Sequence, residues 1–255
     1  LLLLAVDVGN TNIGFGIFRG SELMAHFRVG TDRTKTSDEY GILIKNLIEA
    51  KGISARNVEG GIISCVVPPL IDPLKKALGD FFGIFPLLVE PGVKTGMPIL
   101  YANPKEVGAD RIANAVAAYN KYRRSVIVVD FGTATTFDCI SDRGEYMGGV
   151  IAPGLQVSAE ALFTAASKLP KVEISRPKTV IGKSTVESMQ AGLIYGYAGL
   201  VDGIASRILR EMPRGTRVVA TGGLAGLIAG ESKRIEEVDD LLTLNGLRLI
   251  YDLNR

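Results

Sequence analysis

Two short segments of the sequence share a pattern that suits the binding of phosphate groups. In each, an apolar run ends at an aspartate that glycine and hydroxyl residues follow: VDVGNTN around Asp7 and VDFGTATT around Asp130. Glycine permits a tight turn, whose backbone N–H groups and threonine hydroxyls can face an anion. A carboxylate beside a phosphate repels it unless a hard cation such as Mg²⁺ intervenes. One copy could be an ordinary hairpin with an Asx turn, whereas two copies favour a site that holds a polyphosphate from both sides.

The order of the expected elements around these motifs indicates a duplication. The two aspartates lie about half of the 255-residue chain apart, and each motif follows an apolar strand and leads into further strands. Each half then continues with helices and at least one more strand. We therefore predict an α/β protein of two similar domains, residues 1–117 and 118–255.

The composition excludes several classes of protein. The 29 Lys and Arg residues against 27 Asp and Glu residues give a net charge of +2. This balance argues against a protein that binds nucleic acid or a membrane surface. The single histidine, His26, lies in a predicted strand, where we expect a structural role. Zinc sites built on paired histidines are therefore excluded, and acid–base chemistry is left to carboxylates, Lys or Tyr.

The apolar segments indicate a soluble protein. No apolar run approaches the roughly 20 residues of a membrane span, and LLLLAV at the start lacks the basic flank of a signal peptide. Cys65 and Cys139 each lie within an apolar run, which is typical of buried thiols in a reducing compartment. We expect a cytoplasmic protein.

The segment GADR at residues 108–111 permits two interpretations. Asp110 stands at the start of a predicted helix over 110–124, where a carboxylate can cap the helix. The same carboxylate could accept a proton as a general base. Arg111 is either a surface cation or a ligand for an anionic substrate. A further glycine-rich turn, Thr221–Gly223, follows a predicted strand and is a weak signal by itself.

Together these motifs resemble those of the type III pantothenate kinases, within the superfamily of acetate and sugar kinases, actin and heat-shock chaperones. The matching segments are DVGNTN (7–12), YANP (101–104), GADR (108–111), DFGTATT (130–136), GGVIAPG (148–154) and TGG (221–223). GADR following YANP is the most specific part, and the resemblance extends over essentially the whole chain.

The resemblance implies a fold and an activity. The fold would be two duplicated ribonuclease H-like domains of the actin-like ATPase type, with mixed sheets flanked by helices and the active site in the cleft between them. The activity would be transfer of the γ-phosphoryl group of ATP to pantothenate, the first step of coenzyme A synthesis, with Asp110 as general base. Mg²⁺ would accompany the ATP, and a monovalent cation, K⁺ or NH₄⁺, would also be required.

The resemblance also implies the role of each site residue. The residues expected to bind ATP are Asp7, Val8, Gly9, Asn10, Thr11, Asn12, Ile13, Gly14 and Thr133. Those expected to bind pantothenate are Tyr101, Gly108, Ala109, Asp110, Arg111 and Thr185. Asp130 would bind the monovalent cation, and Asp7 would contact Mg²⁺ through water. In the family, the threonine that matches Thr185 reaches the site of the neighbouring subunit in a homodimer.

Thr185 begins a predicted helix that extends to about residue 212. Four glycines, Gly192, Gly196, Gly199 and Gly203, fall on one face of it. Because glycine weakens a helix, their clustering suggests close approach of another backbone, for which the helix that begins at Asp110 is a candidate. The preceding loop, residues 168–183, is basic, which is typical of a solvated loop.

Two other functions remain open from the residues. Another small-molecule kinase of the same superfamily would keep Asp7 and Asp130 but would not need Tyr101 and GADR. A non-enzymatic, nucleotide-driven switch protein would keep the phosphate-binding turns without a catalytic base.

Overall fold

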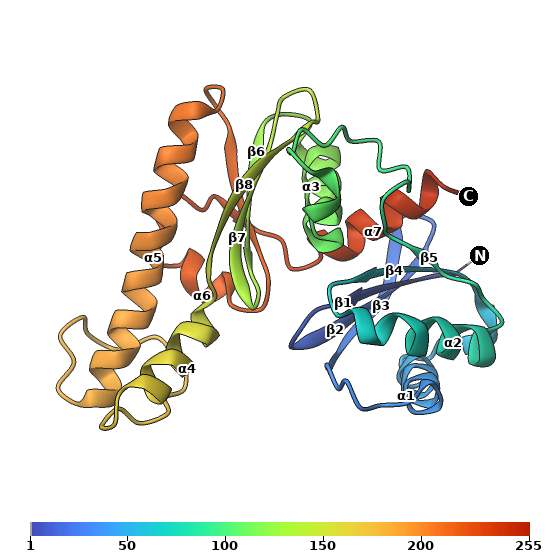
Figure 1. Ribbon diagram of the computed structural model, residues 1–255, viewed down its shortest axis with the longest axis horizontal. Helices are drawn as coiled ribbons and strands as arrows, with labels where there is room; N and C mark the ends of the chain where they lie inside the picture. Colours follow the sequence, from blue (N-terminus) through green and yellow to red (C-terminus); the bar gives the residue numbers. More distant parts are fainter. Residues whose placement is uncertain (1) are drawn as a thin grey trace. The chain divides into compact units, whose positions relative to one another are not determined.

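The computed structural model describes residues 2–255, which form two compact units (Figure 1). The first unit runs to Ala117 and also includes Leu242–Arg255, whereas the second unit is Ala118–Leu241. The boundary at Ala117 falls within helix α3 (Ala109–Tyr122). Within residues 2–255, no helix combines the length and the apolar character needed to cross a lipid bilayer.

The prediction that the second domain comprises residues 118–255 is wrong at its C-terminal boundary, because the second unit ends at Leu241. Helix α7 (Leu242–Asp252) packs against strands of the first unit and buries Leu244, Leu247 and Ile250. An amphipathic pattern shows that one face of a helix must be buried, but it does not show which sheet will cover that face. For this reason the sequence did not reveal that the chain returns to its first unit.

The first unit contains a five-stranded mixed sheet in the order β3-β2-β1-β4-β5. The strands β1, β2 and β3 form an antiparallel meander, and β4 and β5 continue the sheet in parallel with β1. The strands are β1 (Leu2–Val8), β2 (Asn12–Arg19), β3 (Glu22–Gly30), β4 (Val58–Cys65) and β5 (Leu87–Leu88). The helices of this unit besides α3 and α7 are α1 (Ser37–Ala50) and α2 (Ile71–Phe82), with the short 3₁₀ segments η1 (Ala55–Asn57), η2 (Pro68–Leu70) and η3 (Pro104–Glu106).

The second unit repeats this topology strand for strand. Its sheet has the order β10-β9-β6-β7-β8, with an antiparallel meander of β6, β7 and β8, and with β9 and β10 parallel to β6. The strands are β6 (Val126–Phe131), β7 (Ala134–Ile140), β8 (Tyr146–Pro153), β9 (Arg217–Thr221) and β10 (Glu237–Val238). The helices are α4 (Leu155–Ala165), α5 (Thr185–Glu211) and α6 (Ala225–Ala229). The predicted fold class, two duplicated ribonuclease H-like units with mixed sheets flanked by helices, is confirmed.

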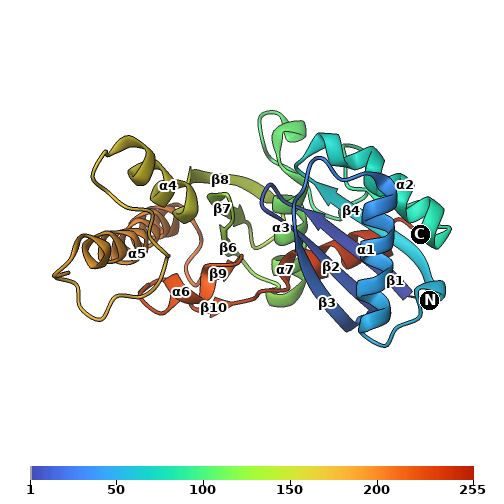
Figure 2. The same ribbon diagram turned by 90° about the horizontal axis from the view of Figure 1, so that it is seen from below.

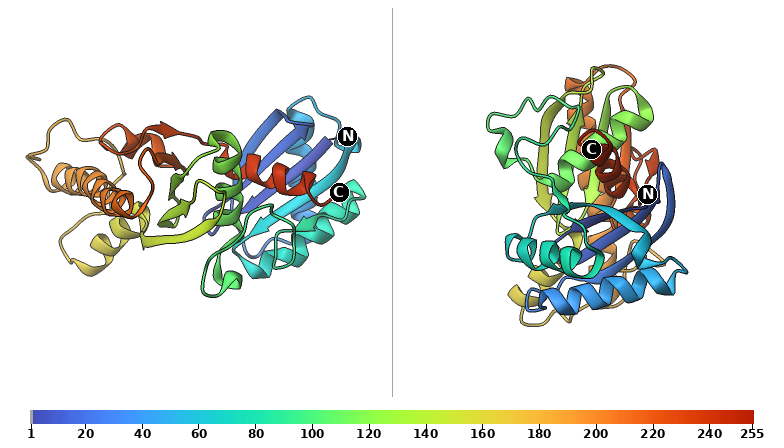
Figure 3. Two further views of the ribbon diagram at one scale, coloured as in Figure 1. Left: turned by 90° about the horizontal axis from the view of Figure 1, so that it is seen from above. Right: turned by 90° about the vertical axis from the view of Figure 1, so that its right-hand side faces the viewer.

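The central strand β1 is buried on both faces, which explains its unbroken apolar run. Leu2, Leu4, Val6 and Val8 form one cluster with residues of α1 and α2. The intervening residues of β1 are directed to the opposite face, which α7 covers; a Cβ on Gly60 of β4 would overlap the hydroxyl of Tyr251 there. Figures 2 and 3 show α1 and α7 on opposite sides of this sheet. On the edge strand β3, His26 is exposed.

We predict that the contact between α7 and α3 limits the stability of the first unit. A Cβ on Gly246 of α7 would overlap the backbone carbonyl of Ala113, and neither helix backbone can yield without displacing its neighbours. Gly246→Ala should therefore cost about 3 kcal/mol, the upper range for overpacking, seen as a lower melting temperature in calorimetry. Gly79→Ala in α2 is the matched control, because no atom lies within 4 Å of its added methyl group. Equal melting temperatures for the two variants would contradict the prediction.

Candidate active site

The first expected phosphate-binding segment is the turn between β1 and β2. The backbone N–H of Gly9 donates to the carbonyl of Asn12 at 3.0 Å, so the turn is tight. A Cβ on Gly9 would lie 3.0 Å from the same carbonyl oxygen, which explains the glycine. Asn10, Thr11 and Asn12 are exposed at the tip. Asp7 is half-buried, and by alternation along β1 its side chain lies on the face of the sheet that α7 covers.

Asp110 occupies the second position of α3 and is not its N-cap. The N-cap is Gly108, whose carbonyl accepts the first helical hydrogen bond from Ile112 at 3.1 Å. The Asp110 Oδ1 atom accepts a 2.8 Å hydrogen bond from the backbone N–H of Arg111. A Cβ on Gly108 would lie 2.5 Å from this Oδ1 atom. The glycine of GADR therefore makes room for the carboxylate.

The environment of Asp110 favours its protonated form. Burial raises the pKa of its carboxyl, although the backbone N–H and the charge of Arg111 both act to lower it. The Arg111 side chain is itself buried, with 8% of the residue exposed. A half-desolvated carboxylate with a raised pKa is a stronger proton acceptor than an exposed one. Asp110 is therefore not the N-cap of α3, and its carboxylate is a candidate proton acceptor.

Helix α7 positions the beginning of α3 relative to the first sheet. The close approach of Gly246 to Ala113 sets the distance between the two helices, and Thr243 Oγ1 donates a 2.7 Å hydrogen bond to Oδ1 of the buried Asn114. Since α7 covers the face toward which Asp7 is directed, Asp7 and the start of α3 lie on the same side of this sheet. The first unit therefore collects the Asp7 turn and GADR on one face.

Tyr101 lies in the irregular segment between β5 and α3 and is half-buried. Within the YANP motif, Asn103 caps η3 by accepting from the backbone N–H of Lys105 at 3.3 Å. The segment is anchored at Lys94, where Asn254 donates to the carbonyl at 2.8 Å and accepts from the N–H at 3.1 Å. Asn254 was missed by sequence reasoning, because no local pattern links positions so far apart in the chain.

In the second unit, the structure brings together Asp130 and the TGG turn. Asp130 of β6 is in register with Thr221 of β9. Gly222 has φ of +95°, and a Cβ there would lie 2.7 Å from both Asp130 Oδ1 and the carbonyl oxygen of Phe131. The glycine keeps open a space that a carboxylate and a carbonyl oxygen border, and oxygen atoms of these kinds are the ligands that hard cations take.

The threonines of DFGTATT differ in their access to solvent. Thr133 is exposed at the turn between β6 and β7, and its carbonyl lies so close to Gly154 that a Cβ there would overlap it. Thr135 is fully buried, and among residues 2–255 its hydroxyl has no hydrogen-bond partner. Thr136 donates to Asp138 at 3.3 Å. Thr135 therefore does not face a ligand, and Thr133 is the hydroxyl of this motif that can.

The structure does not bring Thr185 together with Asp130. Thr185 is the first residue of α5, which packs with Ile127, Val129 and Phe131 on one face of the second sheet (Figure 1). The Asp130 side chain, by alternation, is directed to the other face. Thr185 instead borders an apolar groove of about 490 Å³ along α4 and α5.

The glycine face of α5 is open. No atom of residues 2–255 lies within 4 Å of a Cβ built on Gly192, Gly196 or Gly199, so the expected approach of the helix that follows Asp110 is not observed. Exposed apolar side chains border this face, and Ile181 is 83% exposed. Leu162 and Val180 are exposed and line the same grooves, and Phe163 of α4 and Val186 of α5 are further exposed apolar residues.

The described residues do not contain a ready-made metal centre. Within residues 2–255, no three His, Cys, Asp or Glu side chains gather closely enough to hold a metal ion. Both cysteines are free thiols; Cys139 is buried as expected, whereas Cys65 is half-buried.

Comparison with known proteins places this chain in a family. A model of the type III pantothenate kinases matches residues 3–207. A type III pantothenate kinase from Syntrophus aciditrophicus is 58% identical over 99% of this chain and 100% of its own length, and one from Geobacter sulfurreducens is 58% identical over 100% of both chains. A hexokinase from Thermus thermophilus shares the fold, with a TM-score of 0.51, 15% identity and 98% of both chains covered. The chain is therefore a member of the type III pantothenate kinase family.

Proposed function

We infer that this chain transfers the γ-phosphoryl group of ATP to the primary hydroxyl of pantothenate, the first step of coenzyme A biosynthesis. The observation that carries this inference is the match to type III pantothenate kinases along the whole chain. The half-buried carboxylate of GADR adds a candidate base, which a nucleotide-driven switch protein would not need. Assay of the purified protein with ATP and a panel of hydroxyl acceptors tests the inference, and phosphorylation of another acceptor in preference to pantothenate would contradict it.

The reaction requires one proton acceptor, and we assign that role to Asp110. The pantothenate hydroxyl oxygen attacks the γ-phosphorus and forms the new P–O bond. Its proton passes to the Asp110 carboxylate, and the bond between the γ-phosphorus and the bridging oxygen breaks, leaving the electron pair on ADP. The Arg111 N–H holds Oδ1 of Asp110 in place. Most of the acceleration would come from positioning and charge stabilisation, as is usual for phosphoryl transfer.

The other residues would bind the two substrates. The turn Asp7–Gly14 and Thr133 would hold the phosphates of ATP through backbone N–H groups and hydroxyls. Tyr101 and Gly108–Arg111 would surround pantothenate, with the Arg111 guanidinium opposite its carboxylate. The burial of Arg111 suits this role, because a charge pair is stronger when water is excluded.

Cations would offset the repulsion between carboxylates and phosphates. Asp7 would contact Mg²⁺ through water. Asp130 would bind K⁺ or NH₄⁺, beside the space that Gly222 leaves open. These ions would supply charge neutralisation of the phosphate oxygens.

We predict that Asp110→Asn separates activity from stability. The amide still accepts the Arg111 N–H but cannot take a proton, so kcat should fall on the order of 10²–10⁴-fold. Because burial raises the folded-state pKa of Asp110, the wild type loses stability as pH rises through the interval from the unfolded to the folded pKa. The variant should therefore melt higher than the wild type at neutral pH and equally at low pH.

Calorimetry and kinetics across pH check both parts. Wild-type kcat should fall as pH drops through the raised pKa, and the variant's residual rate should lack this acid limb. Near-wild-type turnover in the variant would end the assignment of Asp110 as the base.

A second prediction concerns the monovalent cation. Activity should be high in potassium or ammonium buffer and low in sodium-only or Tris-only buffer of equal ionic strength, since a specific site is not satisfied by general screening. Asp130→Asn should remove the difference between buffers. Equal wild-type rates in all four buffers would eliminate this cation site.

We further propose that the enzyme is a cytoplasmic homodimer in which α5 of one subunit packs against its partner. The open glycines would let two helix backbones approach closely, and the exposed side chains of Val180, Ile181 and Val186 would be covered. Thr185 would then contact pantothenate in the partner's site. Its placement on the face of the second sheet opposite Asp130 supports an action in another subunit.

Complementation tests the shared site. Asp110→Asn and Thr185→Arg subunits, each inactive alone, should form heterodimers in which one site is intact and the other carries both changes. Random exchange makes half of the dimers mixed, so about a quarter of wild-type activity should return. Mixing Asp110→Asn with Tyr101→Ala is the control, because both changes affect the same side of the site and no intact site can form. Inactive Asp110→Asn/Thr185→Arg heterodimers, purified with two tags, would refute the shared site.

A further inference from the structure

A segment that sequence reasoning left without a role contacts the expected phosphate-binding turn. Residues 31–36, which join β3 to α1 and which we term the strap, lie against the turn 9–12 within the first unit. The Thr31 hydroxyl donates to the carbonyl of Gly9 at 2.6 Å, and the Thr31 N–H donates to the carbonyl of Thr11 at 3.0 Å. Arg33 Nη2 donates to Oδ1 of Asn10 at 3.0 Å. Three successive residues of the turn are thus held by two residues of the strap.

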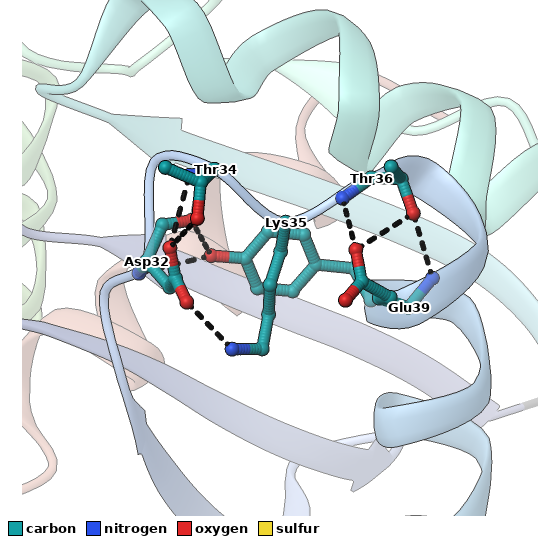
Figure 4. Close-up of polar contacts among 6 residues, drawn as sticks. Asp32, Thr34, Lys35, Thr36 and Glu39 are labelled. Carbon is teal, nitrogen blue, oxygen red and sulfur yellow. Dashed lines mark hydrogen bonds and ion pairs between the residues drawn. The ribbon is translucent and has the colours of Figure 1, made fainter.

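The strap is itself held at Asp32, between these two residues. The Tyr40 ring is fully buried, and its hydroxyl donates to the Asp32 carbonyl at 2.7 Å and accepts from the Asp32 N–H at 3.2 Å. The Asp32 carboxylate accepts from Thr34 at 2.6 Å and pairs with Lys35 at 2.8 Å (Figure 4). One buried hydroxyl therefore fixes the backbone at the centre of the strap.

The next contacts join the strap to α1. Thr36 and Glu39 form a reciprocal capping box, in which the Thr36 N–H donates to the Glu39 carboxylate at 2.7 Å and the Thr36 hydroxyl accepts from the Glu39 N–H at 3.3 Å (Figure 4). The capping box settles where α1 begins. The capping box does not explain the presence of Thr31 and Arg33, because neither residue takes part in it. The hydrogen bonds of these two residues described above are made to the turn 9–12.

The chemistry of these contacts suits a turn that must receive an anion. A carbonyl or amide oxygen that faces a phosphate repels it, whereas N–H groups attract it. Thr31 donates hydrogen bonds to the carbonyl oxygens of Gly9 and Thr11, and Arg33 donates one to the side-chain amide oxygen of Asn10. The structure gives Asn10 this one side-chain hydrogen bond within residues 2–255, so both N–H donors of its amide remain for a ligand. Arg33 also adds an exposed positive charge beside the turn.

We propose that Thr31 and Arg33 are positioning residues for the polyphosphate of the nucleotide, because they hold the turn 9–12 with oxygen atoms of Gly9, Asn10 and Thr11 engaged in hydrogen bonds. This rests on the proposed binding of ATP by the turn. Tyr40 acts one step further away, through Asp32. The substitutions that disturb the strap should weaken binding of MgATP and leave the binding of pantothenate unchanged.

Steady-state kinetics with each substrate varied separately tests the proposal. Thr31→Val and Arg33→Met should each raise KM for MgATP about 10-fold, the loss expected for one good hydrogen bond to a site of this kind. KM for pantothenate should stay within about 2-fold, and titration calorimetry with MgATP alone should show the same weakening. Thr31→Ser restores the hydroxyl and should behave like the wild type. Arg56→Met removes an exposed arginine of the same unit that lies outside the strap and should have no effect.

A double-mutant cycle tests whether Arg33 acts through Asn10. If it does, Asn10→Ala with Arg33→Met should bind MgATP no more weakly than Asn10→Ala alone. Unchanged KM for MgATP in Thr31→Val and Arg33→Met, or an equal rise in KM for both substrates, would overturn the proposal. If Asn10→Ala weakens MgATP binding while the strap variants do not, only the role of the strap fails. If Asn10→Ala also leaves MgATP binding unchanged, the result contradicts the assignment of the turn to ATP, on which the role of the strap depends.

Discussion

The backbone contact between Gly246 and Ala113 is the constraint on which the first unit depends. It allows α7 to lie directly against α3, and α7 in turn covers the face of the sheet toward which Asp7 is directed. The same C-terminal segment carries Asn254, which anchors the chain at Lys94 ahead of Tyr101. The C-terminal segment, α7 together with Asn254, therefore helps to position Asp110, the turn after Asp7 and the chain ahead of Tyr101, although none of these residues lies near it in the sequence.

Much of the fold and of the site could be predicted because the signals are local. The pattern of a buried central strand followed by an aspartate and a glycine occurs once in each half of the sequence. The two sheets that contain these strands have the same strand order. The association of GADR with catalysis came from resemblance, and the structure adds why Gly108 is a glycine.

What could not be predicted depends on contacts between distant segments. The apolar face of α7 was visible, but the sheet that it covers was not. Thr135 resembles Thr133 in sequence, yet Thr135 lies within β7 and is buried, whereas Thr133 lies in the turn before that strand and is exposed. The hydrogen bonds from Thr31 and Arg33 to the turn cross from the end of β3 to the start of β2, and a run of polar residues before a helix is read as a loop and a cap.

The discontinuous first unit has a consequence for the order in which the protein acquires structure during synthesis. The second unit, Ala118–Leu241, is contiguous, so all of its strands are synthesised before α7. The first sheet is synthesised earlier but lacks the helix that covers one of its faces, and that face carries the apolar side chains of Leu3, Ala5 and Ile62. The first unit therefore cannot complete its packing until the whole second unit has been synthesised, and the nascent N-terminal sheet is the part of this chain that a chaperone would need to protect until α7 is available.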